Sequence, residues 1–359
     1  MAAIPPVKLP AVSFDNPDSF SNFWHRLSAT DARRFAVSAS RRTLLCYHDD
    51  AMQDAPAHSG PLRAVAVKVP HYLNAINISE SLFAMPFGYI GMVLASHYST
   101  GIGWPGWHAF IWITLAFLGV RTLGMSANRI INAKEDARNP RTSGRHIPAG
   151  ILKPLEVGGM AAGGAAVFFI AAWQLNPLAL MLSPVAAAYV VLYSFAKYYT
   201  WLCSLMLGFA LSIAPTGAWI GVTGQWDWQP VLITFAVMMW AGGFETIYGT
   251  LDYDFDRENR INSIASRFGV RNAIRTTRIL HILAAAALLA VGIWLDLNVF
   301  YFIGWAVAVI LLIYENNMVK SGEPARIGKA FAFNKYISTQ LLGFTILAVA
   351  LPFKGFLPW

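Results

Sequence analysis

The chain has 359 residues, of which 56% are hydrophobic and only 13% are charged, and its mean hydropathy is +0.47. Because soluble domains carry about 25% charged residues, this composition excludes a soluble globular protein and predicts a polytopic membrane protein. The formal net charge is +8. A basic balance is also typical of nucleic-acid binding, but here the basic residues occupy loops between apolar segments, so we expect no nucleic-acid partner.

Residues 1–70 contain eight basic and six acidic residues, scattered prolines and no long apolar run. They therefore lack the apolar core of a secretory signal. The segment "DARRFAVSASRRTLL" has the Arg and Ser content of an organelle transit peptide, but Asp15, Asp18 and Asp31 precede or interrupt it. We expect a cytoplasmic extension, poorly structured or lying on the membrane surface, and a transmembrane domain over residues 71–359.

Apolar stretches of about 20 residues predict an all-α membrane protein with nine transmembrane helices. These stretches cover residues 78–97, 108–130, 156–173, 177–196, 202–222, 229–250, 279–295, 297–315 and 336–353. The loops after the even-numbered spans hold Lys and Arg, whereas the loops after spans one, three, five and seven hold none. The positive-inside rule then places the N-terminus and the even-numbered loops in the cytoplasm. We expect a bacterial inner membrane, with the mitochondrial inner membrane as the alternative.

Polar side chains recur at the cytoplasmic end of the second span. Asn128, Asn132 and Asp136 are spaced i, i+4 and i+8, so they share one face of a helix. Arg121, seven residues before Asn128, lies on the same face.

The sixth span repeats this pattern in "FETIYGTLDYDFDRENR". Asp252 and Asp256 are four residues apart, Glu245 precedes Asp252 by seven residues, and Tyr248 lies one helical turn before Asp252. The repeat of the spacing four spans later predicts two related four-helix halves that face each other, with one further helix.

Ionisable groups inside a bilayer cost at least ~2.5 kcal/mol each and are retained where they face a polar cavity. Carboxylate and amide oxygens from two facing helix ends suit Mg²⁺, which commonly bridges to substrate phosphates. Arg141 and Arg145 follow the first acidic segment, and guanidinium groups bind phosphate well. The sequence therefore indicates a diphosphate site at the membrane surface, above an apolar interior that holds a lipid tail.

Each of these residues taken alone has a simpler interpretation. A single Asp or Asn at a helix end is typical of a solvated cap, and Arg in a cytoplasmic loop can serve topology alone. Tyr248 is equally consistent with an interfacial aromatic residue. Lys197, the one charge in its short loop, either contacts phosphate or sets orientation. The duplication of spaced carboxylates, each with adjoining Arg, favours a functional site.

The motifs resemble those of the UbiA superfamily of intramembrane prenyltransferases over residues 70–359. Within it they are most similar to 4-hydroxybenzoate polyprenyltransferases and to their relatives in the futalosine route to menaquinone. Besides Arg121 and the two acidic segments, the resemblance rests on "SLFAMPFGYIG", "NPRT", "GAWIGVTG", "FETIYGTLDYDFDRE" and "IASRFGVRNA".

The resemblance implies transfer of a polyprenyl group from polyprenyl diphosphate to an aromatic acid of 4-hydroxybenzoate or naphthoate type, in ubiquinone or menaquinone biosynthesis. It implies Mg²⁺ as the cofactor, with Asn128, Asn132, Asp136, Asp252 and Asp256 as ligands. The implied catalytic residues are Asp136, Asp252, Asp256 and Tyr248. The implied substrate contacts are Arg121, Asn128, Arg141, Arg145, Lys197, Glu245 and Asp254.

The sequence departs from the family pattern at three positions. Asn132 stands where the family usually has Asp, Tyr198 replaces the Arg that commonly follows the Lys at position 197, and Glu245 replaces a frequent Asp. The first two changes are expected to weaken the binding of metal and diphosphate. They motivate an alternative: a catalytically weakened homologue that binds a quinone or isoprenoid as a subunit of a membrane complex.

Two further classes fit less well. A CDP-alcohol phosphotransferase is also membrane-bound and Asp-rich, but its DG-x2-AR type of signature is absent from the sequence. A transporter with intramembrane carboxylates would place them near mid-helix, whereas these lie at predicted helix ends beside Arg-containing loops.

Overall fold

The computed structural model describes residues 61–351, except for the side chains of residues 61–67, 79, 81–83 and 321. Residues 69–351 belong to one compact unit, which contains all the long helices. Most of the predicted N-terminal extension lies outside the described residues, so that part of the domain assignment stays a prediction.

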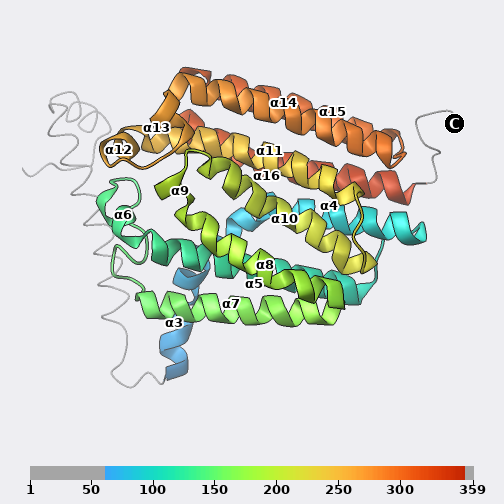
Figure 1. Cartoon of the computed structure of the whole chain (residues 1–359), viewed down its shortest axis with the longest axis horizontal. Helices are drawn as coiled ribbons and strands as arrows, with labels where there is room; N and C mark the ends of the chain where they lie inside the picture. Colours follow the sequence, from blue (N-terminus) through green and yellow to red (C-terminus); the bar gives the residue numbers. More distant parts are fainter. Residues whose placement is uncertain (1–60, 352–359) are drawn as a thin grey trace, which may run out of the picture. The chain divides into compact units, whose positions relative to one another are not determined.

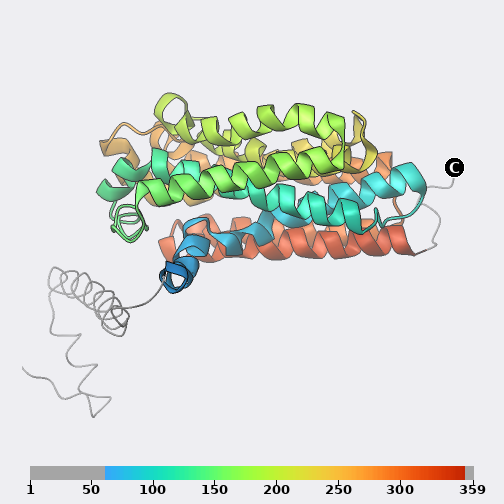
Figure 2. The ribbon, with the colours of Figure 1, turned by 90° about the horizontal axis from the view of Figure 1, so that it is seen from below.

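All regular structure in residues 61–351 is helical, and the long helices run side by side as a bundle (Figures 1 and 2). The long helices are α4 (Ser81–Thr100), α5 (Trp107–Ile131), α7 (Pro154–Leu175), α8 (Pro177–Leu192), α10 (Cys203–Thr223), α11 (Gln229–Tyr248), α14 (Val270–Trp294), α15 (Val299–Met318) and α16 (Pro324–Ala350). The shorter helices are α3 (Pro61–Ala75), η1 (Ile78–Glu80), α6 (Ala133–Arg138), η2 (Tyr193–Phe195), α9 (Ala196–Tyr199), η3 (Gly249–Asp252), α12 (Tyr253–Glu258), α13 (Ile264–Phe268) and η4 (Val319–Ser321).

The prediction of an all-α membrane bundle is confirmed, and each predicted span overlaps one of the long helices. Among the described residues, seven helical stretches are long and apolar enough to cross a membrane, which makes this a multi-pass membrane protein. The stretches contain α5, α7, α8, α10, α11, α14 and α15. The first and last long helices, α4 and α16, are not among them; α4 ends in the polar sequence HYST, and the first half of α16 holds Arg326, Lys329 and Lys335. The count of nine spans is therefore not confirmed.

Glycines allow the closest helix contacts in the bundle. A Cβ atom added to Gly164 of α7 would lie 2.8 Å from the backbone oxygen of Gly119 of α5, and one added to Gly119 would lie 2.7 Å from that of Gly164. Small residues permit such close backbone approach in membrane proteins, where helices associate through packing rather than through exclusion of water. The α5–α7 pair therefore holds the first acidic segment at a defined position.

The main hydrophobic core lies among α4, α10, α11, α14, α15 and α16. Its largest fully buried side chains include Phe87, Trp219, Trp240, Tyr301 and Leu341. This core fixes α11, which carries the second acidic segment, against the C-terminal helices.

Both acidic segments begin where a long helix breaks. Helix α5 ends at Ile131 and the short α6 follows Asn132, while α11 gives way to η3 and then to α12. The two breaks lie at the same end of the bundle (Figure 1). Arg138 at the end of α6 donates a hydrogen bond of 2.9 Å to Asn259 Oδ1, just after α12. The repeat of a long helix, a break and a short helix agrees with the predicted relation between two halves, which stays a prediction beyond this point.

The glycine contact makes a testable prediction about stability. Gly164→Ala places a methyl group against the backbone of α5 and is expected to destabilise the protein by about 1–3 kcal/mol. The matched control is the preceding residue, Gly163, whose added Cβ meets no atom within 4 Å. Gly163→Ala is expected to be neutral or to stabilise by up to ~1 kcal/mol. Thermal unfolding in detergent compares the two variants, and equal melting temperatures would contradict the assigned packing.

Candidate active site

A cavity of about 730 Å³ lies among α4, α5, α7, α8, α10 and α11. Toward the end that carries α6 and α12, its wall is polar and includes Asn128, Asn132, Asp136, Arg141, Arg145, Lys197, Asp252 and Asp256. Toward the opposite end its wall is apolar and includes Phe117, Phe168, Leu175, Leu182, Phe209 and Ile213. A charged mouth above an apolar chamber suits an amphiphilic ligand with a polar head and a hydrocarbon tail.

Asp252 is the acceptor that joins the two acidic segments. Arg141 donates to its carboxylate through Nε, at 2.8 Å from Oδ1, and through Nη2 to Oδ2. Asn139 Nδ2 donates to Asp252 Oδ1 at 2.8 Å. Asn139 precedes Pro140, which disfavours helical backbone at Asn139, and its extended conformation ends α6 and turns its side chain toward η3.

Arg141 also contacts Tyr248. Its Nη1 donates to the Tyr248 hydroxyl at 3.1 Å, and the guanidinium carbon lies 5.1 Å from the centroid of the Tyr248 ring. Burial by itself lowers the pKa of Arg141, but the hydrogen bond and the charge of Asp252 outweigh it and raise that pKa above its usual value. Arg141 therefore stays cationic at the mouth of the cavity.

Asp136 is the corresponding carboxylate of the first acidic segment. It is only 5% exposed, and Arg145 Nη1 donates to both of its oxygens, at 2.7 and 2.8 Å. The Thr142 hydroxyl donates to the backbone oxygen of Asp136 at 3.1 Å. The loop after α6 thus folds back so that its second arginine neutralises the buried carboxylate.

Two neighbours of Asp136 share one tyrosine. The Tyr198 hydroxyl of α9 lies 2.9 Å from Asn132 Oδ1 and 2.8 Å from Glu135 Oε2. Asn132 Nδ2 donates to the backbone oxygen of Asn128 at 3.0 Å, so its amide oxygen faces Tyr198. Lys197, the residue before Tyr198, lies within electrostatic reach of Asp136, Glu135 and Asp256.

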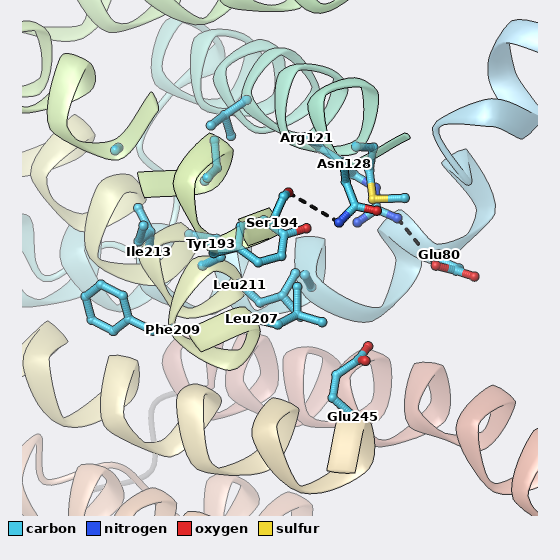
Figure 3. Close-up of a pocket in the computed structure, with 18 of the residues that line it drawn as sticks. Glu80, Arg121, Asn128, Tyr193, Ser194, Leu207, Phe209, Leu211, Ile213 and Glu245 are labelled. Carbon is cyan, nitrogen blue, oxygen red and sulfur yellow. Dashed lines mark hydrogen bonds and ion pairs between the residues drawn. The ribbon is translucent and has the colours of Figure 1, made fainter. Parts of the chain in front are cut away.

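A second polar group lies deeper along α5 (Figure 3). Arg121 Nη2 donates to the backbone oxygen of Asn77 at 2.9 Å and lies 3.9 Å from Glu80 Oε2. Asn128 Nδ2 donates to the Ser194 hydroxyl at 3.2 Å. Glu245 projects from α11 toward the same space and accepts no hydrogen bond from any residue that the structure describes.

The structure brings nearly all of the predicted site residues to this cavity. Eleven of the twelve line it: Arg121, Asn128, Asn132, Asp136, Arg141, Arg145, Lys197, Glu245, Tyr248, Asp252 and Asp256. Asp254 does not, because α12 turns its side chain to the exposed surface. Sequence reasoning missed Glu135, Asn139 and Tyr193, which also line the cavity. The place of Asn139 immediately before a proline, within the segment "NPRT", was the available signal for that residue.

The side chains supply oxygen atoms of the kind that Mg²⁺ prefers. Within residues 61–351, however, no three His, Cys, Asp or Glu side chains are gathered closely enough to hold a metal ion by themselves. Arg145 and Arg141 instead pair with Asp136 and Asp252. The side chains therefore supply the type of ligand that suits Mg²⁺. Binding would require phosphate oxygens to complete the coordination and to draw the two arginines away from the carboxylates.

Comparison with known proteins identifies the class of this fold and site. The model of the UbiA prenyltransferase family matches residues 84–338, so the chain belongs to that family and is an enzyme of the prenyltransferase type. A 4-hydroxybenzoate octaprenyltransferase of Vibrio campbellii is 28% identical over 240 residues, covering 67% of this chain and 84% of its own. The corresponding enzyme of Aeromonas salmonicida is 28% identical over 246 residues, covering 68% of this chain and 84% of its own.

Solved structures show the same fold. The apo structure of a UbiA homologue from Aeropyrum pernix K1 superposes with a TM-score of 0.70 at 29% identity, covering 76% of this chain and 99% of its own. A UbiA homologue from Archaeoglobus fulgidus, solved with DMAPP and Mg²⁺, gives a TM-score of 0.54 at 16% identity, covering 76% of this chain and 99% of its own. The prediction of family membership is thereby confirmed.

The contact between Arg141 and Asp252 can be measured by a double-mutant cycle. The two side chains are 31% and 16% exposed, so solvent weakens the pair only in part, and a coupling of about 1–2 kcal/mol is expected. The cycle uses Arg141→Gln, Asp252→Asn and the double variant, with unfolding free energies measured in detergent. The control pair is Glu323 with Arg326, which are 57% and 54% exposed and should couple by ~0.5 kcal/mol or less. Equal couplings for both pairs would contradict the assigned link.

Proposed function

We propose that this protein transfers a polyprenyl group from a polyprenyl diphosphate to an aromatic acid of the 4-hydroxybenzoate type, with Mg²⁺, in quinone biosynthesis. The observation that carries the proposal is the joining of two acidic segments and their arginines at the mouth of an apolar cavity. Naphthoate-type acceptors belong to the same chemical class and are compared in the assay below. We also propose a bacterial inner membrane, with the charged mouth on the cytoplasmic side, because the Arg-containing loops lie at that end.

Arg141 and Arg145 bind the diphosphate. Guanidinium groups form paired hydrogen bonds with phosphate as they do with carboxylate. When the diphosphate enters, the two arginines exchange Asp252 and Asp136 for phosphate oxygens, and the two carboxylates become free to hold a cation. Mg²⁺ bound there would neutralise charge on the leaving diphosphate. Lys197 adds a further positive charge on the same side.

The apolar wall binds the polyprenyl tail. Leu207, Phe209, Leu211 and Ile213 come from one helix, α10, and line the cavity (Figure 3). Transfer of this tail out of water gives about 25 cal/mol per Å² of apolar surface buried. The same wall excludes water, which would otherwise capture an allylic cation.

The aromatic acid is proposed to bind between Arg121 and Glu245. The Arg121 guanidinium binds the carboxylate of the acceptor. Asn128 lies beside Arg121 on the same helix, α5. Glu245 faces the acceptor from α11 and is placed to accept a hydrogen bond from its hydroxyl, which keeps the ring electron-rich. Cleavage of the allylic C–O bond sends its electron pair to the diphosphate, the ring carbon forms the new C–C bond, and the ring then loses a proton to the departed diphosphate.

The first test is prenyl transfer by the purified chain in nanodiscs with farnesyl diphosphate, 4-hydroxybenzoate and Mg²⁺. Product is expected, EDTA should abolish it, and Asp252→Asn should lower kcat/KM by at least about 100-fold because a carboxylate that holds the cation is lost. Asp254→Asn, which alters an exposed carboxylate two residues away, should leave the rate unchanged. Absence of product with 4-hydroxybenzoate and with 1,4-dihydroxy-2-naphthoate would favour the weakened homologue that binds quinone or isoprenoid.

The acceptor site makes a separate prediction. Arg121→Gln removes the partner of the acceptor carboxylate, so the KM for 4-hydroxybenzoate should rise by roughly 10-fold or more while that for farnesyl diphosphate stays the same. The wild type should prefer 4-hydroxybenzoate to its methyl ester, and the variant should lose this preference. The ratio of the two rates does not depend on the folded fraction. An unchanged ratio would show that Arg121 does not recognise the carboxylate.

A further inference from the structure

Tyr198 stands between two oxygen acceptors but carries one hydroxyl proton. Asn132 Oδ1 and Glu135 Oε2 lie 2.9 and 2.8 Å from its hydroxyl oxygen. A phenol donates one hydrogen bond, and a carboxylate attracts it more strongly than a neutral amide oxygen does. When the Tyr198 hydroxyl donates its hydrogen bond to Glu135, no proton lies between the Tyr198 hydroxyl oxygen and Asn132 Oδ1.

The orientation of the Asn132 amide is set by its own neighbours. Its Nδ2 donates to the backbone oxygen of Asn128 at 3.0 Å, so exchanging the amide oxygen and nitrogen would lose that bond. Asn132 is also only 3% exposed, which leaves little room for water to supply the missing proton. The trio of oxygens is thus short of one hydrogen-bond donor.

Glu135 is the member of the trio that can receive such a partner. It lines the cavity, as Asp136 does, whereas Tyr198, which donates to Glu135, does not line the cavity. No residue that the structure describes donates a hydrogen bond to the other carboxylate oxygen, Oε1. A cation bound to Glu135 on its cavity side would leave the Tyr198 hydroxyl free to donate to Asn132. Each of the three oxygens would then have a partner.

We propose that Glu135, positioned by Tyr198, is the carboxylate that joins Asp136 in binding the divalent cation of the diphosphate, and that Asn132 is a structural acceptor rather than a ligand. The inference rests on the proposed function, because the cation enters with the diphosphate. It also gives the uncharged Asn132 and the nearby Tyr198 a joint role. The carboxylate absent from position 132 is supplied three residues later, on α6.

The test measures cation binding rather than turnover. Mn²⁺, as a spectroscopic substitute for Mg²⁺, is titrated by electron paramagnetic resonance into the full chain in nanodiscs, with and without the unreactive farnesyl thiodiphosphate. Glu135→Gln should weaken Mn²⁺ binding by at least about 10-fold, and Tyr198→Phe by roughly 10-fold, because the first removes a ligand and the second its support. Glu258→Gln, which removes an exposed carboxylate at the end of α12, should leave the affinity unchanged.

A carboxylate exchange separates a ligand from a merely structural residue. Glu135→Gln combined with Asn132→Asp moves the negative charge back to position 132 and should recover most of the lost affinity. If Glu135→Gln binds Mn²⁺ as the wild type does, or if Asn132→Ala weakens binding as much as Glu135→Gln, the proposal is wrong. Absence of any Mn²⁺ binding to the wild type would also overturn it.

The outcome remains distinct from that of the transfer assay. A wild type that transfers prenyl groups while Glu135→Gln keeps its Mn²⁺ affinity rejects the role of Glu135 alone. A wild type that forms no product, yet binds Mn²⁺ in a manner that depends on Glu135 and Tyr198, supports this inference and rejects the proposed reaction.

Discussion

The pairing of Asp136 and Asp252 with one arginine each is the interaction on which the rest of the site depends. Asp136 and Asp252 lie at the mouth of a cavity in an apolar bundle, where an unpaired charge would be costly. Arg145 and Arg141 come from one loop and reach one carboxylate each. This loop therefore ties the end of α5 and α6 to η3, and the two acidic segments face one cavity because their counter-charges share one short stretch of chain.

The fold was largely predictable because seven of the nine long helices in the described residues are marked by a long apolar run. The span prediction did not include the breaks that follow α5 and α11, because hydropathy does not distinguish a continuous helix from one that stops and restarts. Because most spans are uniformly apolar, the sequence also does not indicate which helices pack against each other. The contact of Gly119 with Gly164 depends on the azimuth of two helices, which a run of apolar residues leaves open.

The site was predictable where helical periodicity persists and not where it ends. Asn128 and Asn132 both line the cavity, as their spacing predicts, but the regular α-helix stops at Asn132 before α6 begins. Beyond this point Glu135 and Asp136, although adjacent in sequence, both line the cavity. In α12, Asp256 is buried while Asp254 faces outward, because residues two apart lie on opposite faces of a helix. Short helices after a break cannot be placed by the period of the helix before them.

The ion pairs at the cavity mouth also affect the release of diphosphate, the inorganic product of the proposed reaction. In the proposed reaction, each arginine has an internal competitor for diphosphate, namely the carboxylate to which it is bonded in the free protein. Re-forming those two bonds after the reaction offsets part of the attraction for the product and so shortens its residence time. A site with arginines and no such carboxylates would hold the leaving group more tightly and would suffer stronger product inhibition. In the proposed reaction Asp136 and Asp252 thus favour release of the diphosphate as well as binding of the cation.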